Sequence, residues 1–254
     1  MAFLRNPLAW YKRYVEEVYD TPATPTSVVG RSAHVALEHF YSGASKEVAL
    51  RMGLKYLRNI PDFEINFGKA TSVRAKKEKR RAMEREYQQA VSHYLAKPPK
   101  HEVLGVEVKG VTLVPGLPLP LKAVSDLVVA SPVEEGAVDI VDHKFVNAFS
   151  KSAEKPAFIL QAIFNFYTVQ ALFGKPVRRF IVYECKRTRN ADGSAQLKRH
   201  VIDFKGRESD FITFHRLIHD ATAELANRRI FLPNPSDMFE GENSFDIYRL
   251  GLTD

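Results

Sequence analysis

Two aspartates and a lysine stand at a spacing that suits metal-dependent chemistry: Asp126, Asp142 and Lys144. Carboxylates that face each other on adjacent strands repel, and burying them without a partner costs several kcal/mol. A divalent cation removes this conflict, and oxygen ligands without thiolates favour magnesium or manganese over zinc. A nearby ammonium group would stabilise negative charge that develops on a phosphodiester. The trio therefore predicts a metal site, and the simpler alternative is a solvated strand end with an Asp–Lys ion pair.

The elements that must position these residues are two predicted strands, 121–130 and 137–146, joined by a turn over residues 131–136. A turn centred near residue 134 sets three facing pairs: Ala130–Val138, Val128–Ile140 and Asp126–Asp142. Because side chains alternate across a strand, Lys144 lies on the same face as these pairs and Asp139 lies on the other. The hairpin thus predicts two carboxylates and an ammonium at one end of an apolar face.

A predicted helix from Ser32 to Tyr41 offers a further ligand. His34 and Glu38 are four residues apart and share one helical face, beside apolar residues that can be buried. Gly30 is expected to allow a tight entry to the helix. If the histidine points at the sheet, it can bind the metal, and the alternative is a His–Glu pair on the helix surface.

The rest of the chain alternates between helical and extended patterns. Further helices are expected at residues 7–19, 45–59, 69–96, 155–173 and 208–229, and further strands at 101–113, 179–189 and 196–204. Pro22 and Pro25 are expected to place a loop after the first helix. This order predicts an α/β (α+β) fold with a central mixed sheet flanked by helices. We interpret residues 1–254 as a single domain with a mainly helical part (1–100), a sheet core (101–205) and a C-terminal helix and tail (206–254).

The composition narrows the class of protein. The chain has 37 Lys and Arg residues against 30 Asp and Glu residues, a net charge of +7 that suits a polyanionic partner, although many soluble proteins are mildly basic. One cysteine, Cys185, cannot form an intramolecular disulfide or a four-thiolate cluster. No signal peptide and no apolar stretch long enough for a membrane span is evident. We expect a cytoplasmic protein with no membrane partner.

The ordered set of motifs resembles the RecB-like branch of the PD-(D/E)XK nuclease superfamily, which includes phage and CRISPR-associated exonucleases. The resemblance extends over roughly residues 3–205, and its specificity lies in the order of the set rather than in any one motif. The set consists of Gly30, His34, Glu38, Asp126, Asp142-His143-Lys144 and Gln161.

The resemblance implies a restriction-endonuclease-like core with a role for each of these residues. His34, Asp126 and Asp142 would hold Mg²⁺ or Mn²⁺, and the carbonyl of His143 would add a ligand. Lys144 would be the catalytic lysine, and Gln161 would lie near the site or the DNA.

Two departures from the family pattern bear on these roles. The family helix often reads Gln-x-x-x-Tyr, whereas Asn165 follows Gln161 here and Tyr167 comes two residues later. Many relatives hold an iron–sulfur cluster with four cysteines, which this chain lacks, so we expect the scaffold without a cluster. Phe239, Phe245 and Tyr248 are expected to pack the C-terminal tail instead.

Basic side chains in three segments are candidates for contacts with a DNA backbone. The segments are Lys76–Arg85, which includes Lys77 and Arg81, then Lys186, Arg187 and Arg189, and finally Lys198-Arg199. For the first segment, a solvated charged face with Lys–Glu pairing is the alternative.

The predicted activity is that of a metal-dependent DNA exonuclease or end-processing nuclease in recombination, repair or CRISPR-type processing. DNA ends or single strands would be the substrate, and recombination or repair proteins are expected partners. Two alternatives stay open: a DNA-binding partner protein that does not cut, and an endonuclease.

Overall fold

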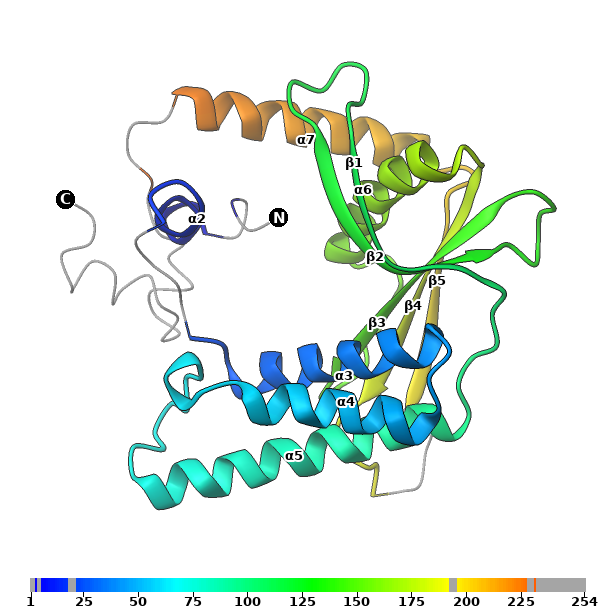
Figure 1. The fold of residues 1–254 in the computed structure, drawn as a ribbon. Helices are drawn as coiled ribbons and strands as arrows, with labels where there is room; N and C mark the ends of the chain where they lie inside the picture. Colours follow the sequence, from blue (N-terminus) through cyan, green and yellow to red (C-terminus); the bar gives the residue numbers. More distant parts are fainter. Residues whose placement is uncertain (1–2, 4–5, 18–21, 192–195, 228–230, 232–254) are drawn as a thin grey trace. The chain divides into compact units, whose positions relative to one another are not determined.

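A computed structural model describes residue 3 and residues 6–17, 22–191, 196–227 and 231 (Figure 1). The chain divides into two compact units. The larger unit comprises Ala23–Arg216 and contains the sheet, whereas the smaller unit combines Met1–Pro22 with Leu217–Asp254. The expected packing of Phe239, Phe245 and Tyr248 lies outside the described residues.

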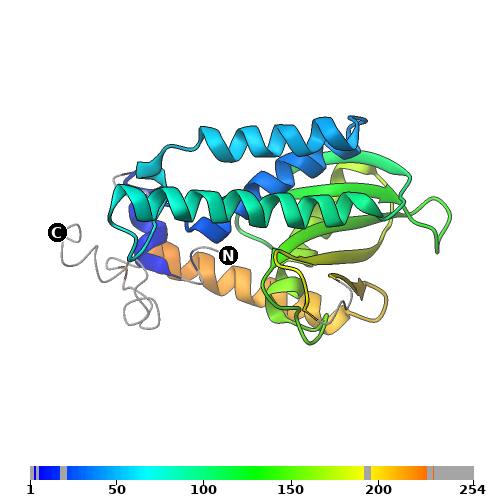
Figure 2. The same cartoon turned by 90° about the horizontal axis from the view of Figure 1, so that it is seen from below.

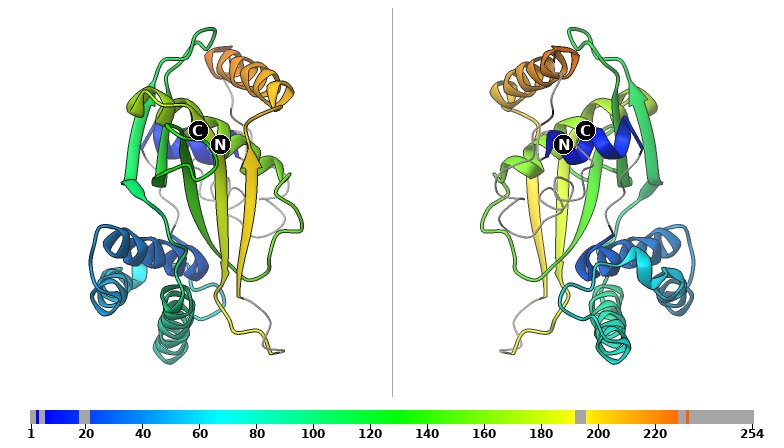
Figure 3. Two further views of the ribbon diagram at one scale, coloured as in Figure 1. Left: turned by 90° about the vertical axis from the view of Figure 1, so that its right-hand side faces the viewer. Right: turned by 90° about the vertical axis from the view of Figure 1, so that its left-hand side faces the viewer.

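The larger unit is built on one mixed five-stranded sheet with the strand order β1-β2-β3-β4-β5. The strands are β1 (Val103–Thr112), β2 (Leu121–Ala130), β3 (Val138–Val146), β4 (Val177–Lys186) and β5 (Leu197–Asp203). Neighbouring strands are antiparallel except for the parallel pair β3 and β4. A parallel pair needs a crossover, which here is the helix α6 (Pro156–Phe173). Figure 3 shows the strands from two further sides.

The predicted register of the β2–β3 hairpin is confirmed. Val128 pairs with Ile140 and Ala130 pairs with Val138, as a turn centred near residue 134 requires. The recorded pairing ends at Leu127 and Val141, so Asp126 and Asp142 lie one residue beyond it. The two aspartates therefore stand where the strands stop pairing.

Helices cover both faces of the sheet (Figures 1 and 2). One face packs against α3 (Pro25–Tyr41), α4 (Lys46–Asn59) and α5 (Val73–Ala96), and a short 3₁₀ helix, η1 (Asp62–Glu64), connects the last two. The other face packs against α6. Alternation along β2 explains the division, because Leu127 and Val129 face the three helices whereas Val128 faces α6. The predicted α/β fold with a central mixed sheet flanked by helices is confirmed.

The start of α3 differs from the sequence-based prediction. The helix begins at Pro25 rather than Ser32, and the side chain of Thr24 caps it by accepting a hydrogen bond from the backbone N–H of Ser27 (3.2 Å). Proline suits the first helical position because the missing N–H is not needed there and its φ already matches the helix. Gly30 consequently lies inside the helix, so its predicted role as the entry to the helix was wrong.

Helix α6 is the one helix among the described residues that is long and apolar enough to cross a membrane by length and composition. Packing on two sides accounts for that composition. Phe158, Ala162 and Val169 are buried against the sheet. On the other side, Phe164 and Phe166 contact the rings of Phe214 and Phe211 in the first turns of α7 (Glu208–Asn227), with ring centroids 4.9 Å apart in each pair.

The smaller unit contains α2 (Pro7–Tyr14), which ends earlier than the predicted residue 19. Asn6 caps it by accepting a hydrogen bond from the backbone N–H of Ala9 (3.0 Å). The rings of Tyr11 and Phe231 stack with centroids 4.3 Å apart, which joins the two chain segments of this unit.

Candidate metal centre and its surroundings

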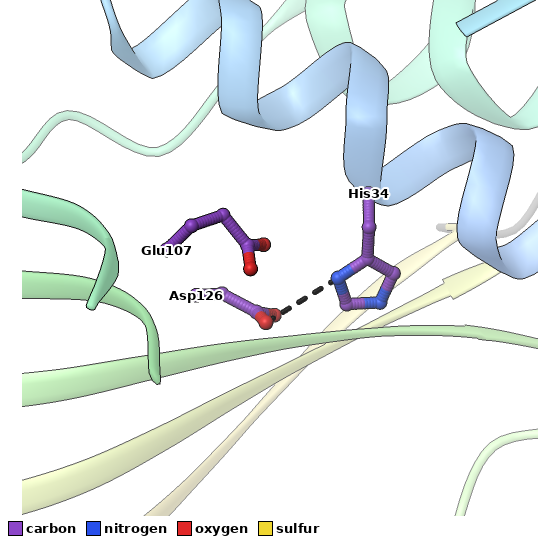
Figure 4. A group of neighbouring side chains, drawn as sticks. All are labelled: His34, Glu107 and Asp126. Atoms are coloured by element: carbon purple, nitrogen blue, oxygen red, sulfur yellow. Dashed lines mark ion pairs between the residues drawn. The ribbon is translucent and has the colours of Figure 1, made fainter. Parts of the chain in front are cut away.

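His34 reaches the edge of the sheet because α3 buries the helical face next to it. Ala33, Ala36 and Leu37 are buried in the core shared by α3, α4, α5 and the sheet. His34 itself is half-buried, and its Nδ1 lies 3.3 Å from Oδ1 of Asp126 (Figure 4). The structure thus brings together the first two of the predicted ligands.

Glu107 is a third member of this group that the sequence analysis missed. One ligand atom each from His34, Glu107 and Asp126 lie within 4.8 Å of one another. Glu107 belongs to β1, where pairing with β2 continues on both sides of it, Val106 with Leu127 and Val108 with Ser125. Its φ of 47° is a left-handed conformation that is uncommon for a residue with a side chain, and such conformations cluster at functional sites. Figure 4 shows its carboxylate directed toward His34 and Asp126.

Asp142 and Lys144 form the neighbouring part of the site. Nζ of Lys144 lies 3.0 Å from Oδ1 and 2.9 Å from Oδ2 of Asp142. Gln161 from α6 donates a hydrogen bond to Oδ1 of the same carboxylate. In the described part of the chain, the buried Oδ2 accepts no well-aligned hydrogen bond, so it keeps coordination capacity. Asp142 is outside the three-residue group around His34, but it is close enough to interact electrostatically with Asp126 and His34.

The charges of the site oppose one another. Burial raises the pKa of Asp142, and the negative charge of Asp126 raises it further despite the counteracting Lys144. Burial and Asp126 likewise raise the pKa of Glu107. Burial also acts against charge on Asp126, but His34 and the hydrogen bond from His143 outweigh it and hold the pKa of Asp126 far below its usual range. A cation between these carboxylates would relieve the repulsion.

His34 partly supplies such a positive charge in the metal-free protein. Burial disfavours the imidazolium, yet the carboxylate of Asp126 outweighs burial and raises the pKa of His34. A bound divalent cation would compete with that proton, because a histidine ligand must be neutral at the binding nitrogen.

His143 holds Asp126 from the opposite side. Its backbone N–H donates to Oδ2 of Asp126 (2.6 Å), and its ring Nδ1 lies 3.4 Å from the same oxygen. On its other side, Nε2 shares a hydrogen bond with the hydroxyl of Tyr94 (2.7 Å), which in turn shares one with Tyr41 (2.7 Å). This buried chain fixes the ring of His143 and with it one oxygen of Asp126, leaving Oδ1 toward His34.

Asn165 ties α6 to the strand that carries Asp126. Its side-chain oxygen accepts a hydrogen bond from the hydroxyl of Ser125 (2.7 Å), and its side-chain nitrogen donates to the carbonyl of Gln161 (2.8 Å). Tyr167 instead shares a hydrogen bond with Nε2 of His215 on α7 (2.7 Å). The residue at the family's tyrosine position is thus a positioning asparagine, and Tyr167 is engaged elsewhere.

The predicted phosphate contacts fall into two kinds of environment. Arg187 is 3% exposed, and its guanidinium donates to Glu86 on α5 and to Asn147. This burial argues against the predicted phosphate contact at Arg187. Lys186 donates to Asn190 (2.7 Å) and is half-buried, whereas Arg189, Lys77 and Arg81 are exposed.

The donor set suits a hard divalent cation. It combines carboxylate oxygens and one imidazole nitrogen, and the described residues contribute no thiolate to it. Magnesium ligands lie about 2.1 Å from the ion, so opposite ligand atoms are about 4.2 Å apart. Small side-chain rotations would bring a group spread over 4.8 Å to that separation. His34, Glu107 and Asp126 therefore fit such an ion, with Asp142 beside them.

Comparisons with known proteins agree with the resemblance seen in the motifs. A family model described as the PD-(D/E)XK nuclease superfamily matches residues 1–238. No curated protein matches the chain. A solved structure described as "Crystal structure of SSO0001" is similar, with a TM-score of 0.33 and 14% sequence identity, over 86% of this chain and 82% of that chain. A structural likeness at this level carries no argument.

Proposed function

Because the chain belongs to the PD-(D/E)XK nuclease superfamily and is thus a metal-dependent nuclease, we propose that it is a magnesium- or manganese-dependent deoxyribonuclease that works from DNA ends. One observation supports the catalytic assignment most strongly. Asp126, with His34 and Glu107, lies beside an Asp142–Lys144 pair, and burial together with Asp126 raises the pKa of Asp142.

We assign roles to the residues of this proposed site. His34, Glu107, Asp126 and Asp142 would hold the ion, with the carbonyl of His143 as a further ligand. When bound, the ion would lower the pKa of a water molecule and stabilise charge on the phosphodiester. Lys144 would place its ammonium next to the oxygen on which negative charge develops. Gln161 would orient Asp142 through the hydrogen bond that it donates.

The basic surface supports DNA as the substrate. The net charge is +7, and α5 presents Lys77 and Arg81 four residues apart, both exposed. Neither makes an ion pair within the part of the chain that the structure describes. Contacts of this kind bind the backbone independently of sequence, which suits end degradation rather than cleavage at a recognition sequence.

The ordered motifs place the protein, in this proposal, in the RecB-like branch of the superfamily. Its process would be recombination, repair or CRISPR-type processing, in a phage or prokaryotic setting and in the cytoplasm, with recombination or repair proteins as partners. The fold is expected to work without an iron–sulfur cluster.

The test is digestion of end-labelled linear duplex, single-stranded and closed circular DNA with Mg²⁺ or Mn²⁺. We expect wild-type protein to degrade linear substrates and leave closed circles intact. Asp142→Ala and Lys144→Ala are expected to lower the cleavage rate by about 10²–10³-fold or more while the circular dichroism spectrum is retained. Lys205→Ala, at an exposed turn lysine, is the matched control and should cleave normally.

Each other outcome has a distinct meaning. Undiminished cleavage by either active-site variant would reject the site assignment. Discrete fragments from closed circles would indicate an endonuclease. DNA binding with a steep salt dependence but no product with any divalent ion would indicate a binding protein that does not cut.

A further inference from the structure

A pocket of about 430 Å³ opens beside the candidate metal centre. His34, Glu107 and Asp126 line one part of it. The remaining wall comes from α3, α4 and β2 and consists of Arg31, Val35, Glu38, Tyr56 and Val124. A pocket of this size accommodates one small ligand, and its position next to the proposed cleavage site makes a nucleotide of the substrate the obvious occupant.

Tyr56 gives this wall an available aromatic ring. The residue is half-buried, since part of it packs against the core while the rest lines the pocket. Within the described residues its hydroxyl makes no hydrogen bond, in contrast to Tyr87, which donates to the carbonyl of Leu50 (2.7 Å), and to Tyr41 and Tyr94. Aromatic side chains at such positions are the usual stacking surfaces for unpaired bases.

Arg31 gives the same wall a positive charge. It lies one helical turn before His34, so the two side chains share a face of α3. It is exposed and makes no ion pair among the described residues, whereas Arg58 pairs with Glu84 and Arg80 pairs with Asp62. An unpaired arginine beside a metal centre is suited to a phosphate group.

The wall also carries features that disfavour a second phosphate. Glu38 brings a negative charge, and Val124 is 41% exposed and apolar. A base fits this part of the pocket better than backbone does, because it brings a π-face and no charge.

We propose that this pocket binds one unpaired nucleotide next to the scissile phosphate, with its base on Tyr56 and a flanking phosphate on Arg31. The inference rests on the proposed nuclease function and specifies its substrate. A base stacked on Tyr56 cannot remain stacked in a duplex, so the site takes single strands or ends whose terminal base has opened.

The first test measures binding without cleavage. In a Lys144→Ala background with Mg²⁺, the affinity for a fluorescein-labelled twelve-residue oligothymidylate is measured by fluorescence anisotropy. Adding Tyr56→Ala is expected to weaken binding by about 5- to 100-fold, the range for one lost stacking contact. Tyr56→Phe should bind normally because it keeps the ring. Phe63→Ala removes an aromatic ring that is 80% exposed outside the pocket, and it is the control expected to have no effect.

A scan with a single abasic residue locates the stacked base. We expect one position of the oligonucleotide to lose affinity on base removal, and we expect that loss to vanish in the Tyr56→Ala protein. Equal binding by Tyr56→Ala and its parent, or an abasic effect that is the same with and without Tyr56, would overturn the proposal. If Tyr56→Ala is unfolded by circular dichroism, Tyr56→Leu, which keeps apolar packing, replaces it with the same criteria.

The second test addresses Arg31 through salt dependence. One lost phosphate contact with a single strand lowers the slope of log K against log salt by about 0.7. We expect that reduction in Arg31→Ala, little change in Arg31→Lys, and none in Arg51→Ala, an exposed arginine of α4 outside the pocket. An unchanged slope in Arg31→Ala would reject the phosphate contact.

The binding results are separate from the cleavage assay. Wild-type protein that binds as described but never cuts would contradict the proposed nuclease function and leave the nucleotide pocket in place. Cleavage that proceeds with unchanged binding and rate in the Tyr56 variants would contradict the pocket alone.

Discussion

Two buried carboxylates on the α6 face of the sheet differ in how they are satisfied. Glu184 on β4 is next to Lys144 in the register, and its oxygens accept hydrogen bonds from the backbone and hydroxyl of Ser150 (2.7 and 2.6 Å), with Nε2 of His200 3.1 Å away. Asp142 on β3, paired with Val182, has Asp126 nearby and one oxygen without a well-aligned hydrogen bond in the described structure.

The pKa directions follow this difference. Burial alone would raise the pKa of Glu184, but its hydrogen bonds from Ser150 and His200 outweigh burial and lower it. At Asp142, burial and the charge of Asp126 act together and raise the pKa. A carboxylate whose neighbours satisfy it stabilises the fold, whereas one left in conflict is available to bind an ion.

The largest effect that would test this comparison is at Glu184. Glu184→Gln is expected to lower the free energy of unfolding at pH 7 by about 1–3 kcal/mol, because hydrogen bonds to a charged acceptor are lost. Urea denaturation monitored by circular dichroism measures the change. Glu135→Gln, at an exposed turn position, is the control and should be near neutral. A stability equal to wild type would mean that the contacts of Glu184 contribute nothing.

A smaller effect of opposite sign is expected at Asp142. In metal-free protein, Asp142→Asn removes a charge that the folded state disfavours, and it should raise the free energy of unfolding by about 0.5–2 kcal/mol. The same denaturation experiment in EDTA measures it. Divalent ions should stabilise wild-type protein more than this variant, and destabilisation of the variant without metal would contradict the electrostatic conflict.

The smallest effect concerns acidification. The lowered pKa of Glu184 means that its contribution to stability is present above about pH 4.5 and is lost as pH falls through the folded-state value. The raised pKa of Asp142 means that its cost is present at neutral pH and is relieved as pH falls through that raised value. Unfolding curves between pH 7 and pH 4 should therefore show the Glu184→Gln deficit shrinking only at the acid end, and the Asp142→Asn gain shrinking first. A Glu184→Gln deficit that shrinks at a higher pH than the Asp142→Asn gain would reverse the comparison.

Local patterns in the sequence predicted the strands and the register that places the two aspartates. Alternation and a short turn determine a hairpin almost completely, which is why Val128–Ile140 and Ala130–Val138 were found. The start of α3 was missed because proline was taken only as a helix breaker, although Pro25 occupies the first helical position.

Glu107 and Arg187 were misjudged because their environments depend on contacts between distant segments. Glu107 reads as an ordinary solvent-facing residue of a strand, and its left-handed backbone and its position beside Asp126 follow from the β1–β2 pairing. Arg187 reads as a surface cation at the end of a strand, but α5 covers it and supplies Glu86. Sequence alternation gives the face of a sheet, but it does not say which helix lies over that face.

The candidate centre draws its side chains from four elements, with His34 on α3, Glu107 on β1, Asp126 on β2, and Asp142 and Lys144 on β3. No segment of the chain contains the set, so it exists only after contacts of large sequence separation have formed. A growing polypeptide on the ribosome would thus carry no cutting activity until β3 has been synthesised and has paired with β2. Dispersing the ligands in this way delays a destructive activity until most of the larger unit has folded.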